Sequence, residues 1–182
     1  MHTCCAPCSV YCIDSLRSEG IEPTVFWYNP NIHPFMEYKA RRDCLKDYAA
    51  SIDVEAIFAE NYGLDEFCRN VVNDLDNRCV NYCYPKRLGE TVRYAVEHGY
   101  DAFTTTLLVS PYQKHDELKK VCERLAEQAG IQFLYRDFRV GYREGQQKAR
   151  ALGMYMQKYC GCIFSEEERY KKQIERELNA SI

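Results

Sequence analysis

Short apolar segments alternate with longer charged segments along most of this 182-residue chain. The apolar segments are rich in β-branched and aromatic residues, which favour strands, and they occupy residues 24–28, 54–59, 101–108 and 131–135. The charged segments predict helices at 7–19, 34–51, 64–76, 85–98, 113–129 and 143–155, with a helical tail from 165. This alternation predicts an α/β fold in which a parallel sheet is flanked by helices. The length fits a single domain over residues 1–182 with a helical C-terminal segment.

Ligands of such a parallel sheet bind beyond the carboxyl ends of its strands. In this chain that edge is formed by loops at 3–9, 28–34, 106–115 and 136–142, which hold most of the unusual residues. We therefore expect the functional site among these loops. The first of them should follow a strand, but only residues 1–3 precede it, so the sequence as given is expected to hold only part of that strand.

Eleven cysteines set this composition apart. Their count is odd, the N-terminus has no basic region followed by an apolar run, and no stretch approaches the length of a membrane span. These features argue against a secreted domain that is stabilised by disulfides. We expect reduced thiols in a cytoplasmic protein without membrane segments, where clustered cysteines serve metal binding or redox chemistry.

The densest cysteine cluster is Cys4-Cys5-Ala6-Pro7-Cys8. Pro7 favours a turn into a helix, and at such a turn neighbouring thiols can face one centre. The helix N-terminus also stabilises thiolates, the form that binds metal. A further pair, Cys79 and Cys83, together with Cys4 and Cys5 makes a four-thiolate site from two segments. Iron–sulfur clusters and zinc both accept four thiolates, so the spacing alone leaves the metal open.

A third group, Cys160-Gly161-Cys162, suits two-electron chemistry. A disulfide between cysteines two apart is strained and easily reduced, which favours a catalytic dithiol over a structural crosslink. Two further metal ligands or two plain thiols are the alternatives. Near the end of the last predicted strand, Asp137 offers a carboxylate that can bind iron or transfer a proton.

Together these motifs resemble the QueH-type epoxyqueuosine reductases. The matching stretches follow in order through nearly the whole chain: His2–Cys8, Tyr28–Pro34, Glu37-Tyr38, Cys83-Tyr84 with Arg87-Leu88, Thr104–His115, Asp137–Arg139, and Tyr159–Cys162 with Ser165. The resemblance implies an enzyme, an oxidoreductase that reduces epoxyqueuosine to queuosine at the wobble position of tRNA, in the last step of queuosine biosynthesis. It also implies a HUP-like (nucleotide alpha-hydrolase-like) fold.

The resemblance further implies a [4Fe–4S] cluster with an additional iron ion beside it. Four cysteines match the cluster ligands by position: Cys4, Cys5, Cys79 and Cys83. Cys160 and Cys162 match a redox-active pair, and we expect their dithiol to supply two electrons. Cys8 and Asp137 are expected as further ligands of the second iron, with proton donation as the alternative role of Asp137. The electron donor that restores the dithiol is unknown from the sequence.

Two other functions compete with this one. A zinc-stabilised RNA- or protein-binding module would need four thiolates, but neither the Cys-Gly-Cys dithiol nor the polar loops at the strand ends. A thiol-based tRNA sulfur-transfer enzyme on a related α/β fold would carry a Ser/Gly-rich phosphate loop after the first strand. This chain has Cys-Cys-Ala-Pro-Cys at that position, which disfavours the use of ATP.

Binding of tRNA by this chain would require local basic surfaces, because the net charge is −3. Three clusters are candidates for phosphate contacts: Lys39, Arg41, Arg42 and Lys46; Lys86, Arg87 and Arg93; and Arg136, Arg139 and Arg143. The target base would also have to leave the anticodon stack to reach a pocket.

Overall fold

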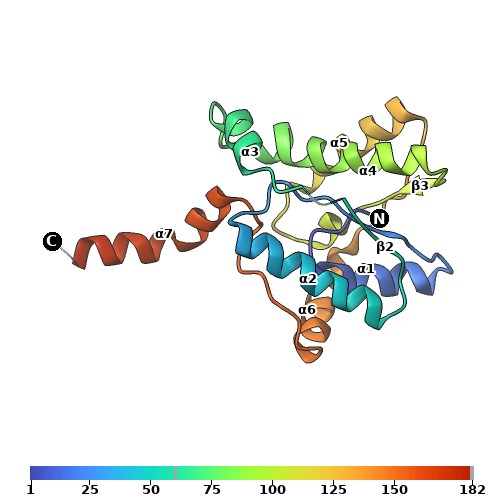
Figure 1. Ribbon diagram of the computed structural model, residues 1–182, viewed down its shortest axis with the longest axis horizontal. Coiled ribbons are helices and arrows are strands. Elements are labelled where there is room, and N and C mark those ends of the chain that lie inside the picture. Colours follow the sequence, from blue (N-terminus) through green and yellow to red (C-terminus); the bar gives the residue numbers. More distant parts are fainter. Residues whose placement is uncertain (60, 181–182) are drawn as a thin grey trace.

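The structure, a computed structural model, describes residues 1–59 and 61–180 (Figure 1). Its strands form two short parallel pairs. In the first pair, β1 (Val25–Trp27) lies beside β2 (Ala56–Phe58). In the second pair, β3 (Ala102–Phe103) lies beside β4 (Gln132–Phe133).

The first three residues join the two pairs into one parallel sheet. His2 forms bridges to Phe26 of β1 on one side and to Thr105, just after β3, on the other. The N–H of Thr3 donates to the Phe26 carbonyl at 2.9 Å, and the N–H of His2 donates to the β3 side at 2.8 Å. The order across the sheet is therefore β2, β1, residues 1–3, β3 and β4. Residues 1–3 thus lie at the centre of the sheet, where the sequence led us to expect part of a strand.

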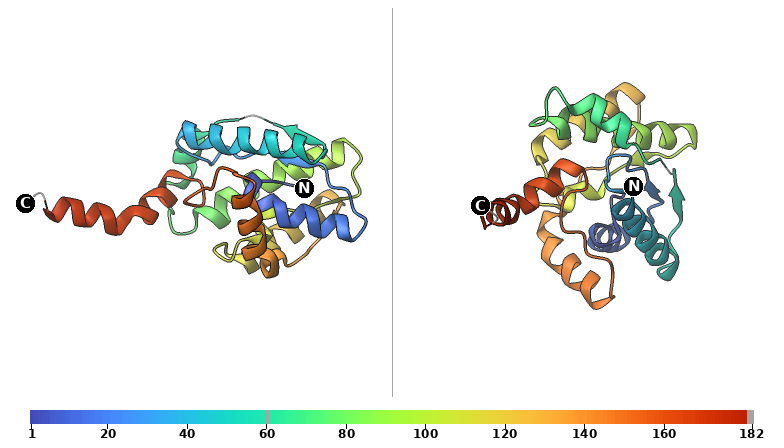
Figure 2. Two further views of the ribbon diagram at one scale, coloured as in Figure 1. Left: turned by 90° about the horizontal axis from the view of Figure 1, so that it is seen from below. Right: turned by 60° about the vertical axis from the view of Figure 1, so that its left-hand side comes forward.

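Helices cover both faces of this sheet, as expected for an α/β fold. They are α1 (Ala6–Ser18), α2 (Phe35–Ser51), α3 (Leu64–Val71), α4 (Tyr84–Glu97), α5 (His115–Ala129), α6 (Tyr142–Ala151) and α7 (Ile163–Ala180). Figure 1 shows α4 and α5 on one side of the strands and α1, α2 and α6 on the other, while α7 extends away from the body. The second view of Figure 2 confirms that most of α7 is clear of the other helices.

Several predicted boundaries are wrong, and local turns explain the differences. The strand expected at 101–108 ends at Phe103, because Thr105 accepts a 3.1 Å hydrogen bond from the Leu107 N–H and begins the 3-10 turn η2 (Thr106–Val109). The strand expected at 131–135 is only β4, and a second 3-10 turn, η3 (Phe138–Gly141), follows it. The helix expected at 64–76 ends at Val71.

A buried polar network fixes the N-terminal segment. The imidazole of His2 is fully buried and contacts the Thr105 hydroxyl at 2.9 Å and the Asn29 side-chain oxygen at 3.2 Å. Asn29 in turn donates to the Thr3 carbonyl at 2.9 Å. Burial lowers the pKa of His2 to about 3, so the ring is neutral and acts as a hydrogen-bonding crosslink. The segment that leads into Cys4 is therefore held from both neighbouring strands.

None of the helices within residues 1–59 and 61–180 is both long enough and apolar enough to cross a membrane.

Candidate metal centre

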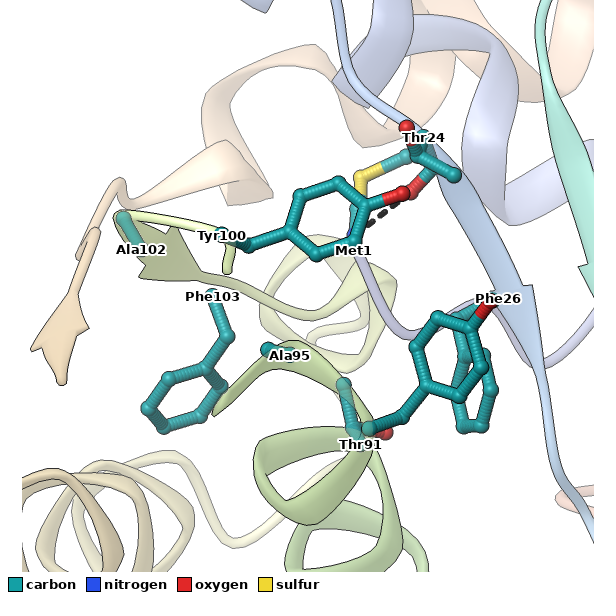
Figure 3. Close-up of a pocket in the computed structure, with 9 residues that line it drawn as sticks. Met1, Thr24, Phe26, Thr91, Ala95, Tyr100, Ala102 and Phe103 are labelled. Atoms are coloured by element: carbon teal, nitrogen blue, oxygen red, sulfur yellow. Dashed lines mark hydrogen bonds between the residues drawn. The ribbon is translucent and has the colours of Figure 1, made fainter. Parts of the chain in front are cut away.

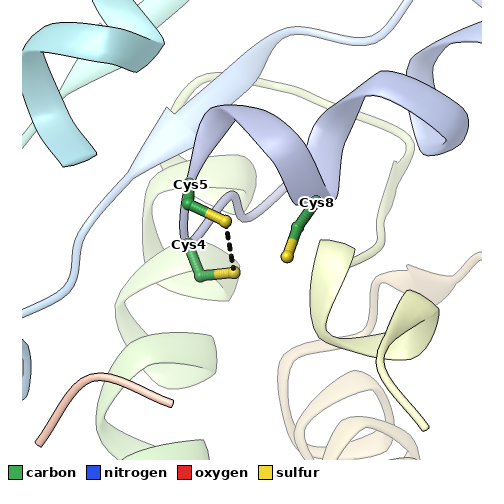
Figure 4. A group of neighbouring side chains, drawn as sticks. All are labelled: Cys4, Cys5 and Cys8. Atoms are coloured by element: carbon green, nitrogen blue, oxygen red, sulfur yellow. Dashed lines mark hydrogen bonds between the residues drawn. The ribbon is translucent and has the colours of Figure 1, made fainter. Parts of the chain in front are cut away.

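Three thiols converge where the chain leaves the central segment and enters α1 (Figure 4). Cys5 is still extended, with φ −174° and ψ 159°, and Pro7 lies in the first helical turn. This change of direction lets Cys4 and Cys5 point the same way, with their sulfurs 3.8 Å apart. One turn later Cys8 faces the same space, and the three sulfur atoms all lie within 4.8 Å of one another. Cys4, Cys5 and Cys8 can therefore hold a metal ion together, as the sequence predicts for this cluster.

The three thiols interact strongly because they are buried side by side. Hydrogen bonds from Cys5 and Cys8 hold the pKa of Cys4 well below its usual range. Burial, followed by the interaction with Cys4, raises the pKa of Cys5, and the hydrogen bond to Cys4 raises the pKa of Cys8. In a buried cluster of this kind, one of the three groups is favoured as a thiolate. A bound cation would favour deprotonation of the other two.

Two polar side chains from distant segments contact these sulfurs. The hydroxyl of Thr106 donates to the Cys4 sulfur at 3.6 Å. The side-chain amide of Gln157 donates to the Cys5 sulfur at 3.0 Å and to the Cys8 sulfur at 3.4 Å. Gln157 was not predicted from the sequence, and the only signal was its position three residues before Cys160. Hydrogen bonds to ligand sulfurs are one means by which proteins tune such centres.

The second predicted pair lies on η1 (Cys79–Cys83), a π-helical turn that leads directly into α4. The Tyr84 N–H bonds to the Cys79 carbonyl and closes this widened turn, a feature that is frequent at functional sites. A hydrogen bond from Cys83, with further help from nearby Arg87 and Arg78, lowers the pKa of Cys79 to about 6. The same hydrogen bond raises the pKa of Cys83. The two thiols therefore form a pair that holds one thiolate near neutral pH.

The Cys-Gly-Cys segment lies between α6 and α7. Its central glycine has φ +151°, and a Cβ atom there would approach a side-chain carbon of Ile32 to 3.1 Å. Glycine is thus required on both conformational and steric grounds. Cys160 is exposed and accepts a 3.4 Å hydrogen bond from Gln113, whereas Cys162 is buried beside the first turn of α7. Both thiols are free in the structure, and their redox role stays a prediction.

One cavity of about 930 Å³ brings these groups together. Its walls include six of the cysteines: Cys4, Cys8, Cys79, Cys83, Cys160 and Cys162. Cys5 does not line the cavity, but its sulfur contacts the Cys4 sulfur and the Gln157 amide, both of which belong to residues of the cavity wall. The cavity opens at the carboxyl ends of the central segment and β3, which is the edge predicted to bind ligands. A second pocket, between Met1, Phe26 and Phe103, has only about 20 Å³, room for about one water molecule (Figure 3).

Asp137, like Cys5, is a predicted site residue that does not line this cavity, and unlike Cys5 it contacts none of the cysteines that do among the described residues. Its carboxylate accepts hydrogen bonds from the Arg139 N–H at 3.1 Å and from the Arg139 guanidinium at 2.6 Å. This pairing lowers the pKa of Asp137 to about 2. In this conformation the carboxylate caps η3 and is ionised. The predicted roles of Asp137, as an iron ligand or a proton donor, stay predictions.

The basic residues around the cavity coincide only in part with those expected. Of the predicted phosphate contacts, Arg41 and Arg87 are each only 1% exposed, and others are paired with carboxylates, as Arg136 is with Glu19 at 2.7 Å. Cations nevertheless gather on the cavity walls: Arg41, Arg78, Arg87, Lys114, Arg150, Lys158, Arg169 and Lys172. Only Asp76 and Glu168 oppose them among the residues that line it. Four tyrosines, Tyr84, Tyr112, Tyr142 and Tyr159, lie between the cations.

The parallel sheet and its cysteine-lined cavity define an α/β protein with a group of buried thiols, able to hold a metal ion, at the carboxyl edge of the strands. The comparisons identify the family. A family model described as epoxyqueuosine reductase QueH matches residues 1–168. The epoxyqueuosine reductase QueH of Dehalococcoides mccartyi is 40% identical over 172 residues, which cover 94% of each chain.

More distant relatives carry the same name. The epoxyqueuosine reductase QueH of Thermotoga maritima is 32% identical over 96% of this chain and 93% of its own length. That of Haemophilus influenzae is 30% identical over 91% of this chain and 70% of its own length. The chain belongs to the epoxyqueuosine reductase QueH family, as the motifs in its sequence led us to expect.

Proposed function

We propose that this chain reduces epoxyqueuosine to queuosine at the wobble position of tRNA, in the last step of queuosine biosynthesis. Family membership supports the reaction, and one observation carries the mechanism. Cysteines from three distant segments line one cavity at the carboxyl edge of the sheet. In the sheet, β1 and β2 lie on one side of residues 1–3, and β3 and β4 lie on the other. This strand order also supports the proposed HUP-like fold. We propose that the protein acts in the cytoplasm. A reducing compartment of this kind would keep Cys160 and Cys162 in the dithiol form that can donate electrons.

For the cofactor we propose a [4Fe–4S] cluster held by Cys4, Cys5, Cys79 and Cys83. The donor set fits this assignment, because four free thiols from two chain segments approach the same cavity and each pair favours one thiolate. Cys8 adds a fifth thiol beside the first pair and is the proposed ligand of an additional iron. Such a centre would supply electron transfer and a Lewis acid for the epoxide oxygen.

Cys160 and Cys162 are the proposed source of electrons. Opening the epoxide to an alkene requires two electrons and two protons, and the oxygen leaves as water. Oxidation of one dithiol to a disulfide releases two electrons and two protons, so the two half-reactions balance. Cys162 lies in the same small apolar cluster as Cys83, which supports transfer from the dithiol toward the second thiol pair.

Asp137 keeps both of its proposed roles, as a ligand of the additional iron or as a proton donor. Its exposed carboxylate is paired with Arg139, so either role requires that pair to separate when substrate binds. His115 approaches the same group from the start of α5 and contributes to its low pKa.

The walls of the cavity fit a nucleotide that has left the anticodon stack. The tyrosine rings offer faces on which a base can stack, and the cations can bind the flanking phosphates. Its volume of about 930 Å³ lies at the upper end of small-ligand pockets, which suits a modified nucleoside with part of its backbone.

The test is an anaerobic preparation assayed on tRNA that carries epoxyqueuosine, with a chemical reductant and mass spectrometry of the digested nucleosides. Loss of one oxygen from the modified base is the expected product. Metal analysis of the same sample distinguishes iron from zinc. A colourless zinc protein that binds the tRNA without converting it would instead support the zinc-stabilised RNA-binding module.

A further inference from the structure

The helix α7 extends away from the body (Figures 1 and 2), and residues of its first turns, among them Ser165 and Arg169, line the cavity. We propose that its basic stripe, formed by Arg169, Lys172 and Arg176, binds backbone phosphates of the substrate tRNA outside the cavity. This inference rests on the proposed function, since it assigns part of the tRNA surface. It also concerns residues that follow the segment 1–168 matched by the family model.

The helical register places the stripe on the face of α7 that lines the cavity. Residues three or four apart share a helix face, so Ser165, Arg169, Lys172 and Arg176 lie in one row. Ser165, Arg169 and Lys172 all line the cavity. Arg176 is the next member of the same row, one turn further out, and its guanidinium donates to the Lys172 carbonyl at 3.1 Å. The row therefore continues the cationic wall of the cavity beyond its rim.

The start of α7 is fixed to the body, whereas its remainder has little contact with the rest of the chain. Ile163 and Phe164 pack against the apolar cluster that contains Cys162. Glu168 is paired with the buried Arg78 at 2.6 Å, which fixes the second turn and neutralises the acidic residue nearest the stripe. At 1.5 Å per residue, Arg176 lies roughly 16 Å beyond Ser165 along the axis. That reach extends past the flipped nucleotide to phosphates further along the RNA.

The charges of the stripe are available for phosphate. Within the described part of the chain, no carboxylate lies within ion-pair distance of Arg169, Lys172 or Arg176. Two of the cations predicted on α2 and α4 differ in this respect, because Lys39 is paired with Asp43 and Lys86 with Glu66, both at 2.5 Å. Cations held near a cavity without such partners attract a polyanion more strongly than paired cations do.

The opposite face of α7 carries an apolar row of Tyr170, Ile174 and Leu178. Leu178 is 64% exposed, so this row could be covered by a second copy of the chain. We favour RNA as the partner of α7 because the basic row continues a cavity wall, whereas Tyr170, Ile174 and Leu178 do not line the cavity. Self-association through α7 is therefore an outcome that the experiment must detect.

The experiment compares two single substitutions on one helix. Arg176→Gln removes the outermost charge of the stripe, and Lys171→Gln removes one charge from a face turned away from it. Binding of unmodified substrate tRNA is measured by fluorescence anisotropy between 50 and 300 mM salt, concentrations on the order of those at which phosphate contacts are resolved. Circular dichroism and light scattering check helicity and mass, and wild-type protein provides the reference.

We expect Arg176→Gln to weaken binding about fivefold near physiological salt and to lower the slope of log K against log salt by about one. Lys171→Gln should leave both values close to those of the wild type. Equal effects of the two substitutions, or a change in mass that depends on α7, would overturn the inference. Failure of the wild-type protein to bind or convert tRNA would instead contradict the proposed function, so the two failures are distinguishable.

Discussion

The guanidinium of Arg41 donates a 2.9 Å hydrogen bond to the backbone carbonyl of Cys160, 119 positions further along the chain. A second bond from the same group reaches the Tyr159 carbonyl at 3.0 Å, and a third reaches Glu37 at 2.7 Å. Arg41 is 1% exposed, and the Tyr155 hydroxyl donates to the same carboxylate of Glu37. Helix α2 thus fixes the backbone of the dithiol segment through a buried ion pair.

Replacing Arg41 with lysine should loosen this segment without removing the charge. A lysine can still pair with Glu37, but it cannot donate to two carbonyls at once, because it lacks the planar fork of the guanidinium. We expect the free energy of unfolding to fall by about 2–4 kcal/mol and the amides of residues 159–162 to exchange with deuterium faster. Lys39→Arg, on the exposed face of the same helix, is the control. Unchanged exchange in the Arg41→Lys protein would mean that the two carbonyl bonds do not hold the segment.

Gln157 should tune the proposed cluster through its bonds to Cys5 and Cys8. Hydrogen bonds to ligand sulfurs favour the more negative, reduced state. Gln157→Leu should therefore make the reduction potential of the iron centre more negative, as followed by a spectroscopic redox titration. The control is Gln146→Leu, which also changes the cavity wall but contacts none of these sulfurs within the described structure. If both variants keep the wild-type potential, Gln157 has only a structural role.

The sequence predicted the type of nearly every element but not the lengths of the strands. Periodicity and turn residues identify helices well. They did not reveal that the strand ends before Thr104 and that Thr105 caps a 3-10 turn beginning at Thr106, since threonine favours strands as readily as it caps helices. Residues 1–3 pair at the centre of the sheet, and a strand was expected there from the loop that follows it and not from a pattern in the segment itself.

The site was predictable where its chemistry is local and unpredictable where it depends on long-range packing. The close spacing of Cys4, Cys5 and Cys8 was enough to predict their convergence. The contact of Gln157 with this cluster spans about 150 positions and has no sequence signature. Arg41, which the sequence suggested as a phosphate contact, is buried and donates to the Tyr159 and Cys160 carbonyls, and these contacts over 118 and 119 positions are visible only in the fold.

His33 should make the protein less stable in mild acid. The ring is buried, Nε2 bonds to the Pro30 carbonyl at 3.1 Å, and Nδ1 has no partner among the described residues. Burial lowers the pKa of His33 to about 4. The unfolded chain, with a histidine pKa near 6.5, therefore binds the proton first, so stability is full above pH 6.5 and is lost as the pH falls toward 4.

Urea unfolding of wild-type and His33→Phe proteins between pH 7 and pH 4 measures this effect. The variant should have the smaller pH dependence, by at most about 1 kcal/mol per pH unit. Its absolute stability at pH 7 should also be lower, because the bond to the Pro30 carbonyl is lost. Parallel pH profiles of the two proteins would assign the acid sensitivity to other groups.

Cys83→Ser should remove more than half of the iron and the brown absorbance. The reason is that Cys83 is the buried member of the second thiol pair, and serine is a poor ligand for iron of this type. Cys44→Ser, at a half-buried cysteine on α2, is the matched control and should retain wild-type iron. Iron content is measured after anaerobic purification. An iron content equal to that of the control would remove Cys79 and Cys83 from the proposed ligand set.

Cys162→Ser should abolish multiple turnover while sparing the metal centre and the RNA surface. The serine cannot form a disulfide with Cys160, so the two electrons needed to open the epoxide are no longer stored beside the cluster. With tRNA that carries epoxyqueuosine and a chemical reductant, we expect the steady-state rate to fall by at least about tenfold, with unchanged iron content and tRNA affinity. Cys160→Ser should behave in the same way, although Cys160 is exposed and Cys162 is buried, because a dithiol requires both members. Loss of activity in only one of the two variants would identify a single reactive thiol, and full activity in both would show that electrons reach the centre by another route.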